Sequence, residues 1–427
     1  MLLETRGEKI RDGRFLRLIA GMLTAGYLED WTWHATLSGA PQGGPASPIM
    51  SNIYLDRLDT FAETQLLPLH NRGERRAPSP AYHRVKRAER RARRTGDHGL
   101  ARALRLRSRD LPSGDPGDPG YRRLRYIRYC DDILLGFSGP KAEAVEIKQA
   151  LGTFLHEELR LDLSEAKTLI THAQTGRARF LGYDIMTQHA NTKITRGQRA
   201  VNGSIGLLVP REAITRRCAQ YMRKGKPECR PQMFSDDDYT IISQYQAEYR
   251  GVVQYYLLAN DVYRLNRLSW VMGTSLLKTL AGKHKSTVSK MARKYKAMIS
   301  TPEGPRTCFR TVVERGEGKK PLVAWFGGIP LKRQPKAALK DRAPVLVTTK
   351  GNELIRRLVS GCCELCGAQQ RLEVHHIRKL ADLNRPGRRE KPSWVQTMAR
   401  RRRKTLILCR RCHENTHAGK SNTDTLT

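Results

Sequence analysis

The sequence lacks any apolar run that approaches the length of a membrane-spanning helix, which argues against an integral membrane protein. Its first residues, Met1 to Arg6, also lack the apolar core of a secretory signal peptide. Acidic residues are few: 41 Asp and Glu stand against 78 Lys and Arg, which gives a net charge of +37 over 427 residues. A positive charge of this size implies a polyanionic partner. A basic, ribosome-type protein is an alternative that composition alone leaves open.

Cysteine is also sparse, with nine residues in a chain long enough for two or three domains. Four of the nine form two Cys-x-x-Cys pairs, Cys363 with Cys366 and Cys409 with Cys412. This pattern favours metal binding in a reducing compartment over disulfide bonds. Four thiolates in two such pairs make a closed tetrahedral zinc site. The segment between the pairs is longer than in a plain zinc ribbon, so it must hold structure of its own.

Two adjacent carboxylates, Asp131 and Asp132, lie between two apolar, β-prone runs within residues 125–137. This pattern indicates a strand, a tight turn and a second strand. Neighbouring carboxylates repel each other unless a cation lies between them, and oxygen ligands of this kind suit Mg²⁺. Two such ions can activate a 3′-hydroxyl and stabilise a leaving pyrophosphate. An ordinary solvated turn fits these residues equally well when they are taken alone.

The context of this turn resembles a reverse transcriptase. Tyr129-Cys130-Asp131-Asp132 is similar to the Tyr-x-Asp-Asp signature, with Cys where bacterial retroelements usually have Ala. Residues 39–55 resemble the Pro-Gln-Gly block and following helix of group II intron reverse transcriptases, and residues 163–168 and 180–183 match the next two blocks in order. The resemblance implies that Asp131 and Asp132 are catalytic Mg²⁺ ligands. It also implies nucleotide or template contacts at Gln42, Gly43, Tyr129 and Lys167.

The chain departs from this family near its start. The helix that we expect within residues 10–30 resembles the one that precedes the Pro-Gln-Gly block, so the family's first catalytic aspartate has no counterpart. Asp12 and Asp30 lack the apolar strand that a palm position needs, and we interpret both as surface residues. We therefore expect the first palm strand to be absent and this chain alone to have little polymerase activity.

Two further regions are strongly basic. Residues 70–120 are rich in Arg, Gly and Pro, which predicts a flexible solvated insertion or, alternatively, a contact with RNA phosphates. Residues 205–300 show helical periodicity, and residues 249–256 resemble the maturase thumb, or domain X, of group II proteins. We expect most tyrosines of that stripe to be core residues. The candidate RNA contacts in the thumb are Lys283, Lys285, Lys290, Arg293 and Lys294.

The C-terminal region resembles the zinc-containing His-Asn-His (HNH) nuclease domain of group II intron proteins. His375 and His376 lie between the two cysteine pairs, and His413 and His417 follow the second pair. The resemblance implies that His376 is the general base and that His375 and His413 bind the nuclease ion, with His417 a third ligand or a phosphate contact. The middle position of the motif, often Asn, falls near Lys404. A purely structural zinc domain that binds DNA is the alternative.

These patterns predict a multidomain α+β protein of the group II intron-encoded family. We expect partial reverse-transcriptase fingers and palm, an antiparallel sheet with helices, over residues 1–195 with the basic insertion 70–120. An all-α thumb or maturase domain (196–300), a linker (301–350), a small zinc-containing ββα HNH endonuclease domain (351–420) and a tail (421–427) should follow.

Such a protein would bind intron RNA to assist splicing, copy RNA into DNA and cut target DNA. The expected cofactors are Mg²⁺ at the polymerase and nuclease sites and a structural Zn²⁺. The expected partners are group II intron RNA, target DNA and dNTPs, without a membrane, and the bacterial cytoplasm is favoured over an organelle. Two alternatives remain: a non-polymerising RNA-binding splicing cofactor, and a DNA endonuclease with an RNA-targeting module.

Overall fold

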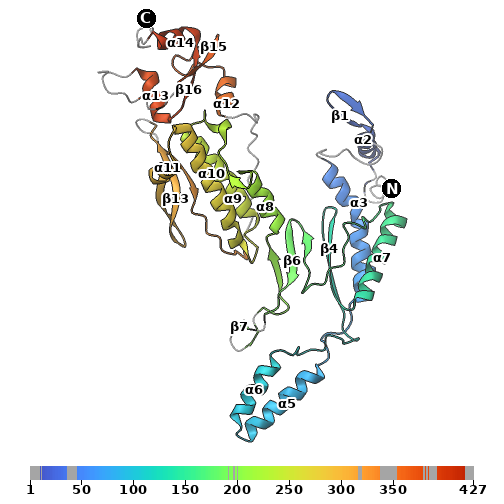
Figure 1. Cartoon of the computed structure of the whole chain (residues 1–427). Coiled ribbons are helices and arrows are strands. Elements are labelled where there is room, and N and C mark those ends of the chain that lie inside the picture. Colours follow the sequence, from blue (N-terminus) through green and yellow to red (C-terminus); the bar gives the residue numbers. More distant parts are fainter. Residues whose placement is uncertain are drawn as a thin grey trace. The chain divides into compact units, whose positions relative to one another are not determined.

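The chain divides into two compact units, Met1–Gly206 and Leu207–Thr427, and each has hydrophobic cores of its own (Figure 1). No helix in the described part of the chain is long and apolar enough to cross a membrane. The computed structural model describes residues 10, 12–35, 46–190, 192–195, 198–199, 201–315, 320–336, 353–377, 380, 383 and 392–418.

The first unit begins with the helix that the sequence predicts, α2 (Gly13–Thr24). Asp12 caps it, because its carboxylate accepts hydrogen bonds from the backbone N–H groups of Arg14 and Phe15 at 2.8 and 3.2 Å. The chain then turns through Gly26, whose φ of +73° suits glycine. A short antiparallel hairpin follows, made of β1 (Tyr27–Glu29) and β2 (Thr32–His34).

A continuous helix comes next, formed by α3 (Ser47–Phe61), a π-helical turn (Ala62–Leu66) and α4 (Leu67–His70). Pro68 lacks a backbone N–H and interrupts the regular hydrogen-bond ladder, and the π turn directly before it accommodates the interruption. The helix starts at Ser47 with Pro48 in an early position, as the sequence predicts.

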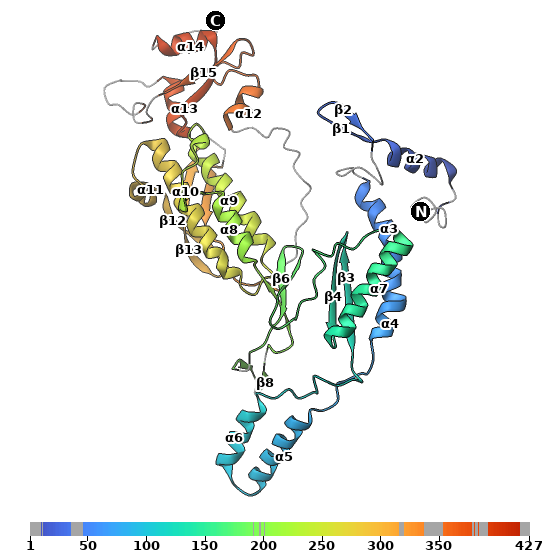
Figure 2. The same cartoon turned by 45° about the vertical axis from the view of Figure 1, so that its right-hand side comes forward.

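The antiparallel strands β3 (Arg123–Tyr129) and β4 (Asp132–Ser138) form a two-stranded sheet. The helices α3 and α7 (Lys141–Leu159) lie beside it (Figure 2). A leucine core joins the helices to β4, and burying each such side chain contributes roughly 1.5–3 kcal/mol. The buried leucines are Leu55, Leu58, Leu151, Leu155 and Leu159.

The expectation that residues 70–120 form a flexible insertion is wrong. The basic region 70–120 contains two helices, α5 (Pro80–Arg94) and α6 (His98–Ser108), because Ser79 and Asp97 supply helix caps and the intervening residues favour helix. Leu159, Leu161 and Leu163 alternate as in a strand, but residues 160–163 form none, because α7 continues to Leu159 and ends at Arg160 in the left-handed conformation.

Short hairpins complete the first unit. The strands β5 (Ala178–Phe180) and β6 (Tyr183–Thr187) are joined by Leu181 and Gly182, both with positive φ, as a type I′ turn requires. A smaller pair follows, β7 (Ile194–Thr195) and β8 (Gln198–Arg199). The strand β9 (Ile205–Leu208) lies at the junction of the two units.

Helices dominate residues 207–295, but the expectation of an all-α domain over residues 196–300 is wrong, because short strands also lie in this range. The helices are α8 (Arg211–Ala219), α9 (Asp238–Tyr255), α10 (Asn266–His284) and α11 (Val288–Tyr295), with 3-10 turns at Pro231–Met233 and Val262–Leu265 and a hairpin of β10 (Met222–Arg223) and β11 (Lys226–Pro227). Tyr245 and Tyr249 of α9 are buried, as expected for core tyrosines. The Tyr245 hydroxyl lies 2.9 Å from Ser275 Oγ and 3.0 Å from Thr279 Oγ1 in α10.

A three-stranded antiparallel sheet follows the helices, made of β12 (Lys296–Thr301), β13 (Gly304–Val313) and β14 (Leu322–Gly327). It covers α9: the Phe326 ring lies 5.6 Å from the Tyr249 ring, and Gly327 N–H donates to Gln246 Oε1 at 3.0 Å. Much of this sheet lies in the range expected as a linker. Its glycine and proline content concealed these strands, which are paired with one another and pack against α9.

The C-terminal part contains α12 (Glu353–Val359), β15 (Leu372–His376), α13 (Ser393–Arg401), β16 (Thr405–Cys409) and α14 (Arg410–His417). The strands β15 and β16 are antiparallel, and α14 follows β16 directly. This is the ββα arrangement that the sequence predicts. Its core includes Met398, Leu406 and Leu408, all fully buried.

Candidate functional site

Asp131 and Asp132 lie at the tip of the β3–β4 hairpin. Tyr129 pairs with Asp132 across the ladder, so Cys130 and Asp131 form the two-residue turn, with Cys130 at a φ of +53°. Both carboxylates are exposed. Among the described residues, no third His, Cys, Asp or Glu lies close enough to complete a metal-binding group with them. The turn predicted from the sequence is present, and the described residues supply two carboxylates to it.

Arg128 anchors this turn to α3. Its Nη1 donates to the Cys130 carbonyl at 2.7 Å and to Asn52 Oδ1 at 2.9 Å, and its Nε donates to Asp59 Oδ1 at 2.8 Å. Tyr126 also donates its hydroxyl to Asp59, at 2.7 Å. The hydrogen bond from Arg128 is the largest cause of a lowered pKa at Asp59, so the pair stays charged. The sequence analysis did not identify Asn52 and Asp59. Their spacing of two helical turns puts both side chains on one face of α3, and this could have indicated a shared partner.

The other residues expected near the polymerase site are only partly described. Gln42 and Gly43 lie outside the described residues. Tyr129 is 62% exposed on the turn side of β3. Lys167 is exposed in a turn after α7, where its backbone N–H donates to the Ser164 carbonyl at 3.1 Å.

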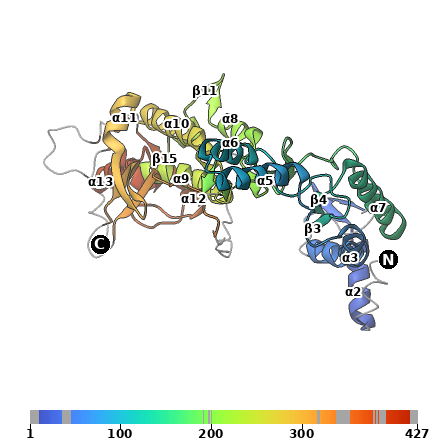
Figure 3. The ribbon, with the colours of Figure 1, turned by 90° about the horizontal axis from the view of Figure 1, so that it is seen from below.

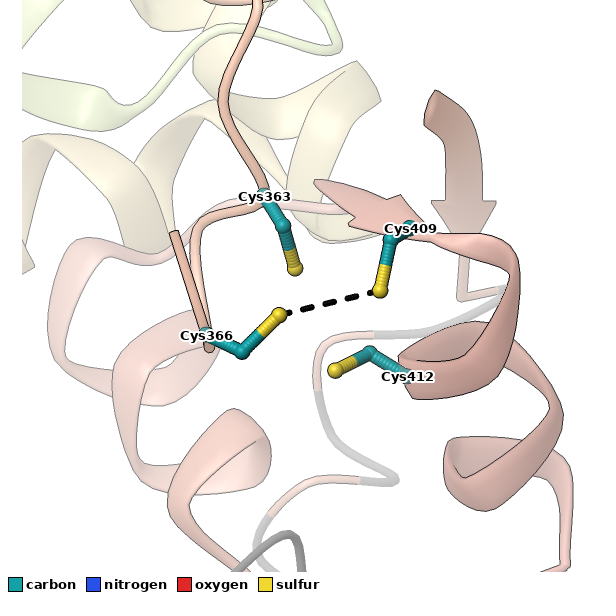
Figure 4. Close-up of side chains that lie close together, drawn as sticks. All are labelled: Cys363, Cys366, Cys409 and Cys412. Atoms are coloured by element: carbon teal, nitrogen blue, oxygen red, sulfur yellow. Dashed lines mark hydrogen bonds between the residues drawn. The ribbon is translucent and has the colours of Figure 1, made fainter. Parts of the chain in front are cut away.

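The four paired cysteines come together in the C-terminal domain (Figure 4). Cys363 and Cys366 lie on a turn before β15, Cys409 ends β16 and Cys412 lies in the first turn of α14. Gly367, with φ of +77°, lets the turn close, and its N–H donates to the Cys363 carbonyl at 3.0 Å.

The geometry of these thiols fits a tetrahedral metal centre. Zn–S bonds of about 2.3 Å place two sulfurs about 3.8 Å apart at neighbouring corners of a tetrahedron. The Sγ atoms of Cys366 and Cys409 lie 3.7 Å apart, too far for a disulfide (Figure 4). Burial raises the pKa of Cys363, but backbone N–H groups of Cys366, Cys409 and Leu365 outweigh it and lower that pKa to about 7. Cys363 thus already favours the thiolate, the form that binds zinc, whereas burial raises the pKa values of Cys366 and Cys412.

A second cluster consists of three histidines whose ligand atoms all lie within 4.8 Å of one another: His375, His413 and His417. His375 of β15 is buried, and neither of its ring nitrogens has a hydrogen-bond partner. Burial, followed by the charges of the neighbouring histidines, lowers the pKa of His375 to about 4. A neutral imidazole with an unpaired buried nitrogen is costly by itself, and a bound divalent ion would satisfy it.

Glu373 orients this cluster. His413 Nδ1–H donates to Glu373 Oε2 at 2.5 Å, which leaves His413 Nε2 available, and His417 Nε2 lies 3.1 Å from that nitrogen. His413 and His417 share one face of α14 because they are four residues apart. Sequence reasoning gave Glu373 no role. Glu373 lies two residues before His375, so both side chains are on one face of β15, and this spacing could have indicated that Glu373 belongs to the site.

His376 lies outside the three-histidine cluster. It is exposed at the last position of β15, and successive strand residues point to opposite faces, so its ring does not join that of His375. His376 directly follows His375 in β15, and its charge is the smallest of the causes that lower the pKa of His375. Lys404, near the expected middle position of the motif, has a pKa lowered by burial and then by Lys283 and Lys285.

The basic residues expected to contact RNA do not share one surface. Lys285, Lys290, Arg293 and Lys294 are exposed around the turn between α10 and α11. Lys283 is fully buried, and its Nζ donates to Asp238 Oδ1 at 2.7 Å and to the Asp236 carbonyl at 2.6 Å. Its charge is neutralised inside the fold, so the expectation that Lys283 contacts RNA is wrong.

A hairpin with two adjacent aspartates at its tip, and a ββα domain with four clustered thiols and three clustered histidines, point to a protein that acts on nucleic acids. Comparison with protein families agrees. Residues 13–185 match the reverse transcriptase (RNA-dependent DNA polymerase) family, residues 203–313 the type II intron maturase family, and residues 363–413 the AI2M/AI1M-like HNH endonuclease family.

Similar proteins come from bacteria and eukaryotes. The group II intron-encoded protein LtrA of Lactococcus lactis subsp. cremoris is 34% identical over 95% of this chain and 69% of its own length. The putative COX1/OXI3 intron 2 protein of Saccharomyces cerevisiae is 28% identical over 99% of this chain and 49% of its own length. The chain belongs to the group II intron-encoded protein family and carries reverse-transcriptase, maturase and HNH endonuclease domains. The predicted family is confirmed.

Proposed function

We propose that the C-terminal domain cuts one strand of a target DNA, with His375, His413 and His417 as ligands of a divalent ion and His376 as the general base. The observation that carries this proposal is the buried His375 ring, whose two nitrogens have no partner although two other histidines lie against it. The four cysteines already form a complete zinc set, so the histidines are free for a second ion.

Each residue has a distinct part in this reaction. When bound, the ion stabilises negative charge on the scissile phosphate. Glu373 holds His413 with Nε2 toward the cluster, and Trp394, with its ring 5.4 Å from that of His375, helps to shield the buried imidazole from water. His376, exposed at the end of β15 and next to His375 in the chain, takes the proton from the attacking water. The zinc held by the cysteines is structural, because it leaves no open position for substrate.

A nicking assay with the zinc-loaded full chain and its intron RNA tests this proposal. His376→Ala should lower the nicking rate by roughly 10²–10⁴-fold, the usual contribution of a general base. It should leave binding of Mn²⁺, measured by calorimetry, unchanged. His413→Ala should weaken Mn²⁺ binding instead, and added Mn²⁺ should partly restore nicking.

The control is Glu414→Gln, which changes an exposed residue of the same helix whose carboxylate pairs with Arg410. It should leave both nicking and Mn²⁺ binding at wild-type values. Normal nicking by a folded, zinc-loaded His376→Ala protein would instead return the domain to a structural, DNA-binding role.

The same proposal assigns the remaining modules. Asp131 and Asp132 hold Mg²⁺ for DNA synthesis from dNTPs, supported by their exposure at a rigid turn. Gln42, Gly43, Tyr129 and Lys167 contact nucleotide or template. The exposed thumb residues Lys285, Lys290, Arg293 and Lys294 contact intron RNA during splicing.

A second function is favoured by one observation. The two aspartates have no third metal ligand among the described residues, although two-metal chemistry needs a fuller carboxylate cage. This chain by itself is therefore better suited to bind RNA and assist splicing than to polymerise DNA.

A further inference from the structure

The helical hairpin formed by α5 and α6, residues 80–109, has an unusual charge. It carries eleven Arg or Lys residues and two acidic residues. The exposed cations are Arg84, Arg87, Arg90, Arg91, Arg93, Arg94, Arg102, Arg105 and Arg107. Such a surface repels itself unless a polyanion covers it.

The hairpin keeps these charges on a firm frame. The helices α5 and α6 lie side by side in Figures 1 and 3, with the small residues Ala92, Ala101 and Ser108 buried between them. Buried Glu89 binds Lys86 and Arg93, both at 2.7 Å. The inner face is therefore neutralised internally, and the arginines that remain point to solvent.

The base of the hairpin is also held in place. The Asp118 carboxylate accepts the Ala77 N–H at 2.6 Å, and Asp115 N–H donates to the Ala77 carbonyl at 2.8 Å. Arg76 reaches Ser138 Oγ of β4 at 2.6 Å. The two segments that enter and leave the hairpin are thus tied to each other and to the β3–β4 sheet, which is not the behaviour of a loose insertion.

The exposed arginines of α5 are ordered along the helix. Arg84, Arg87, Arg91 and Arg94 follow one another at spacings of three and four residues, so they form one stripe about 15 Å long. Aromatic side chains that could stack on unpaired bases are lacking: from Pro80 to Arg109 the sequence holds no Phe or Trp, and its single Tyr, Tyr82, is half-buried under Lys86.

We propose that this stripe binds the phosphate backbone of a paired RNA helix and does not read bases. Guanidinium groups suit phosphate oxygens, and duplex RNA is recognised mainly through its backbone and shape. Single-stranded RNA is disfavoured because its recognition relies on aromatic stacking. The inference rests on the RNA binding that belongs to the proposed function, which favours RNA over DNA as the polyanion.

The test uses the full chain and three probes: a 20-base-pair RNA duplex, a single-stranded RNA and a DNA duplex of equal length. The test variant changes Arg84, Arg87, Arg91 and Arg94 to Gln, which has a similar helix propensity. Its matched control changes the same four residues to Lys and keeps the charge. A second variant, Arg102→Gln with Arg105→Gln on α6, measures the contribution of the hairpin to RNA-duplex affinity independently if the first variant fails to fold.

We expect the Gln variant to bind the RNA duplex at least about tenfold more weakly at 0.15 M salt, with a salt slope reduced by about 3. The Lys variant should retain most of the affinity. Unchanged duplex affinity in the folded Gln variant, an equal loss in the Lys variant, or a larger loss for DNA or single-stranded RNA would overturn the inference. A wild-type chain that binds none of the probes would refute RNA binding itself, and with it the proposed function.

Discussion

At the scale of single residues, the ion pair between Lys283 and Asp238 joins α10 to the start of α9. Both side chains are almost completely buried. Asp238 also accepts hydrogen bonds from the Tyr295 hydroxyl and from His284 Nε2. Burial alone would raise the pKa of Asp238, but Lys283 and His284 outweigh it and hold that pKa far below its usual range. Arg402 Nη1 also lies 3.4 Å from Asp238 Oδ2. Removing the Asp238 charge is costly, because Lys283 would remain charged and buried without its ion-pair partner.

Asp238→Asn should therefore destabilise the second unit by about 3–5 kcal/mol at pH 7, since it leaves Lys283 unpaired. Urea unfolding of the zinc-loaded protein measures this loss. The exposed Asp56→Asn should change stability by less than about 0.5 kcal/mol.

The contribution of Asp238 to stability should depend on pH with a definite sign. The pKa of Asp238 is lowered by folding, so its contribution is present above about pH 4 and lost as the pH falls further.

The stability difference between wild type and Asp238→Asn should thus shrink below pH 4. A difference that stays constant from pH 7 to pH 3 would show that the Asp238 charge does not stabilise this unit.

At the scale of elements, the four cysteines join the turn before β15 to the end of β16 and the start of α14. The hydrophobic core of this small domain is the cluster around Met398, Leu406 and Leu408, and ion pairs of Arg357 and Arg403 with Glu353 and Glu364 add to it. Metal binding at such a site therefore contributes directly to the free energy of folding.

Cys363→Ser should remove zinc and unfold the domain over residues 353–418, while α9 and α10 stay folded. Hydrogen exchange measures both effects: amides of β15, β16 and α14 should lose protection, and those of α9 and α10 should keep it. Cys362→Ser is the matched control, because Cys362 is adjacent in sequence but lies outside the four-cysteine cluster. Equal zinc content in the two variants would show that Cys363 is not a ligand.

At the scale of the whole molecule, each unit carries chemistry that the other lacks. The first unit contains the Asp131–Asp132 turn and the basic hairpin, and the second contains the maturase helices and the nuclease domain. The net charge of +37 is divided among several basic surfaces, including the α5–α6 hairpin and the turn after α10.

The purified 427-residue chain should show little primer extension with Mg²⁺, because the described residues supply only two carboxylates to the turn and each ligand that a two-metal site lacks raises the barrier by several kcal/mol. Extension of a DNA primer on an RNA template measures this directly. Robust extension that Asp131→Ala abolishes would contradict the prediction and show that two carboxylates suffice. The RNA affinity of Asp131→Ala should equal that of the wild type, because binding depends on the basic surfaces.

The sequence by itself determined the features that depend on short spacings along the chain. The turn at Tyr129–Asp132 and the two cysteine pairs follow from short spacings along the chain, whereas the roles expected of the aspartates and histidines came from the resemblance to the family and stay predictions. Only the tertiary structure decided which distant residues meet and which charges are buried. It paired Lys283 with Asp238, placed Glu373 against His413, tied Arg128 to Asp59 and covered α9 with β12–β14. The sequence does not distinguish a lysine that faces water from one that pairs with a buried carboxylate. Burial depends on contacts between segments that are distant in the chain.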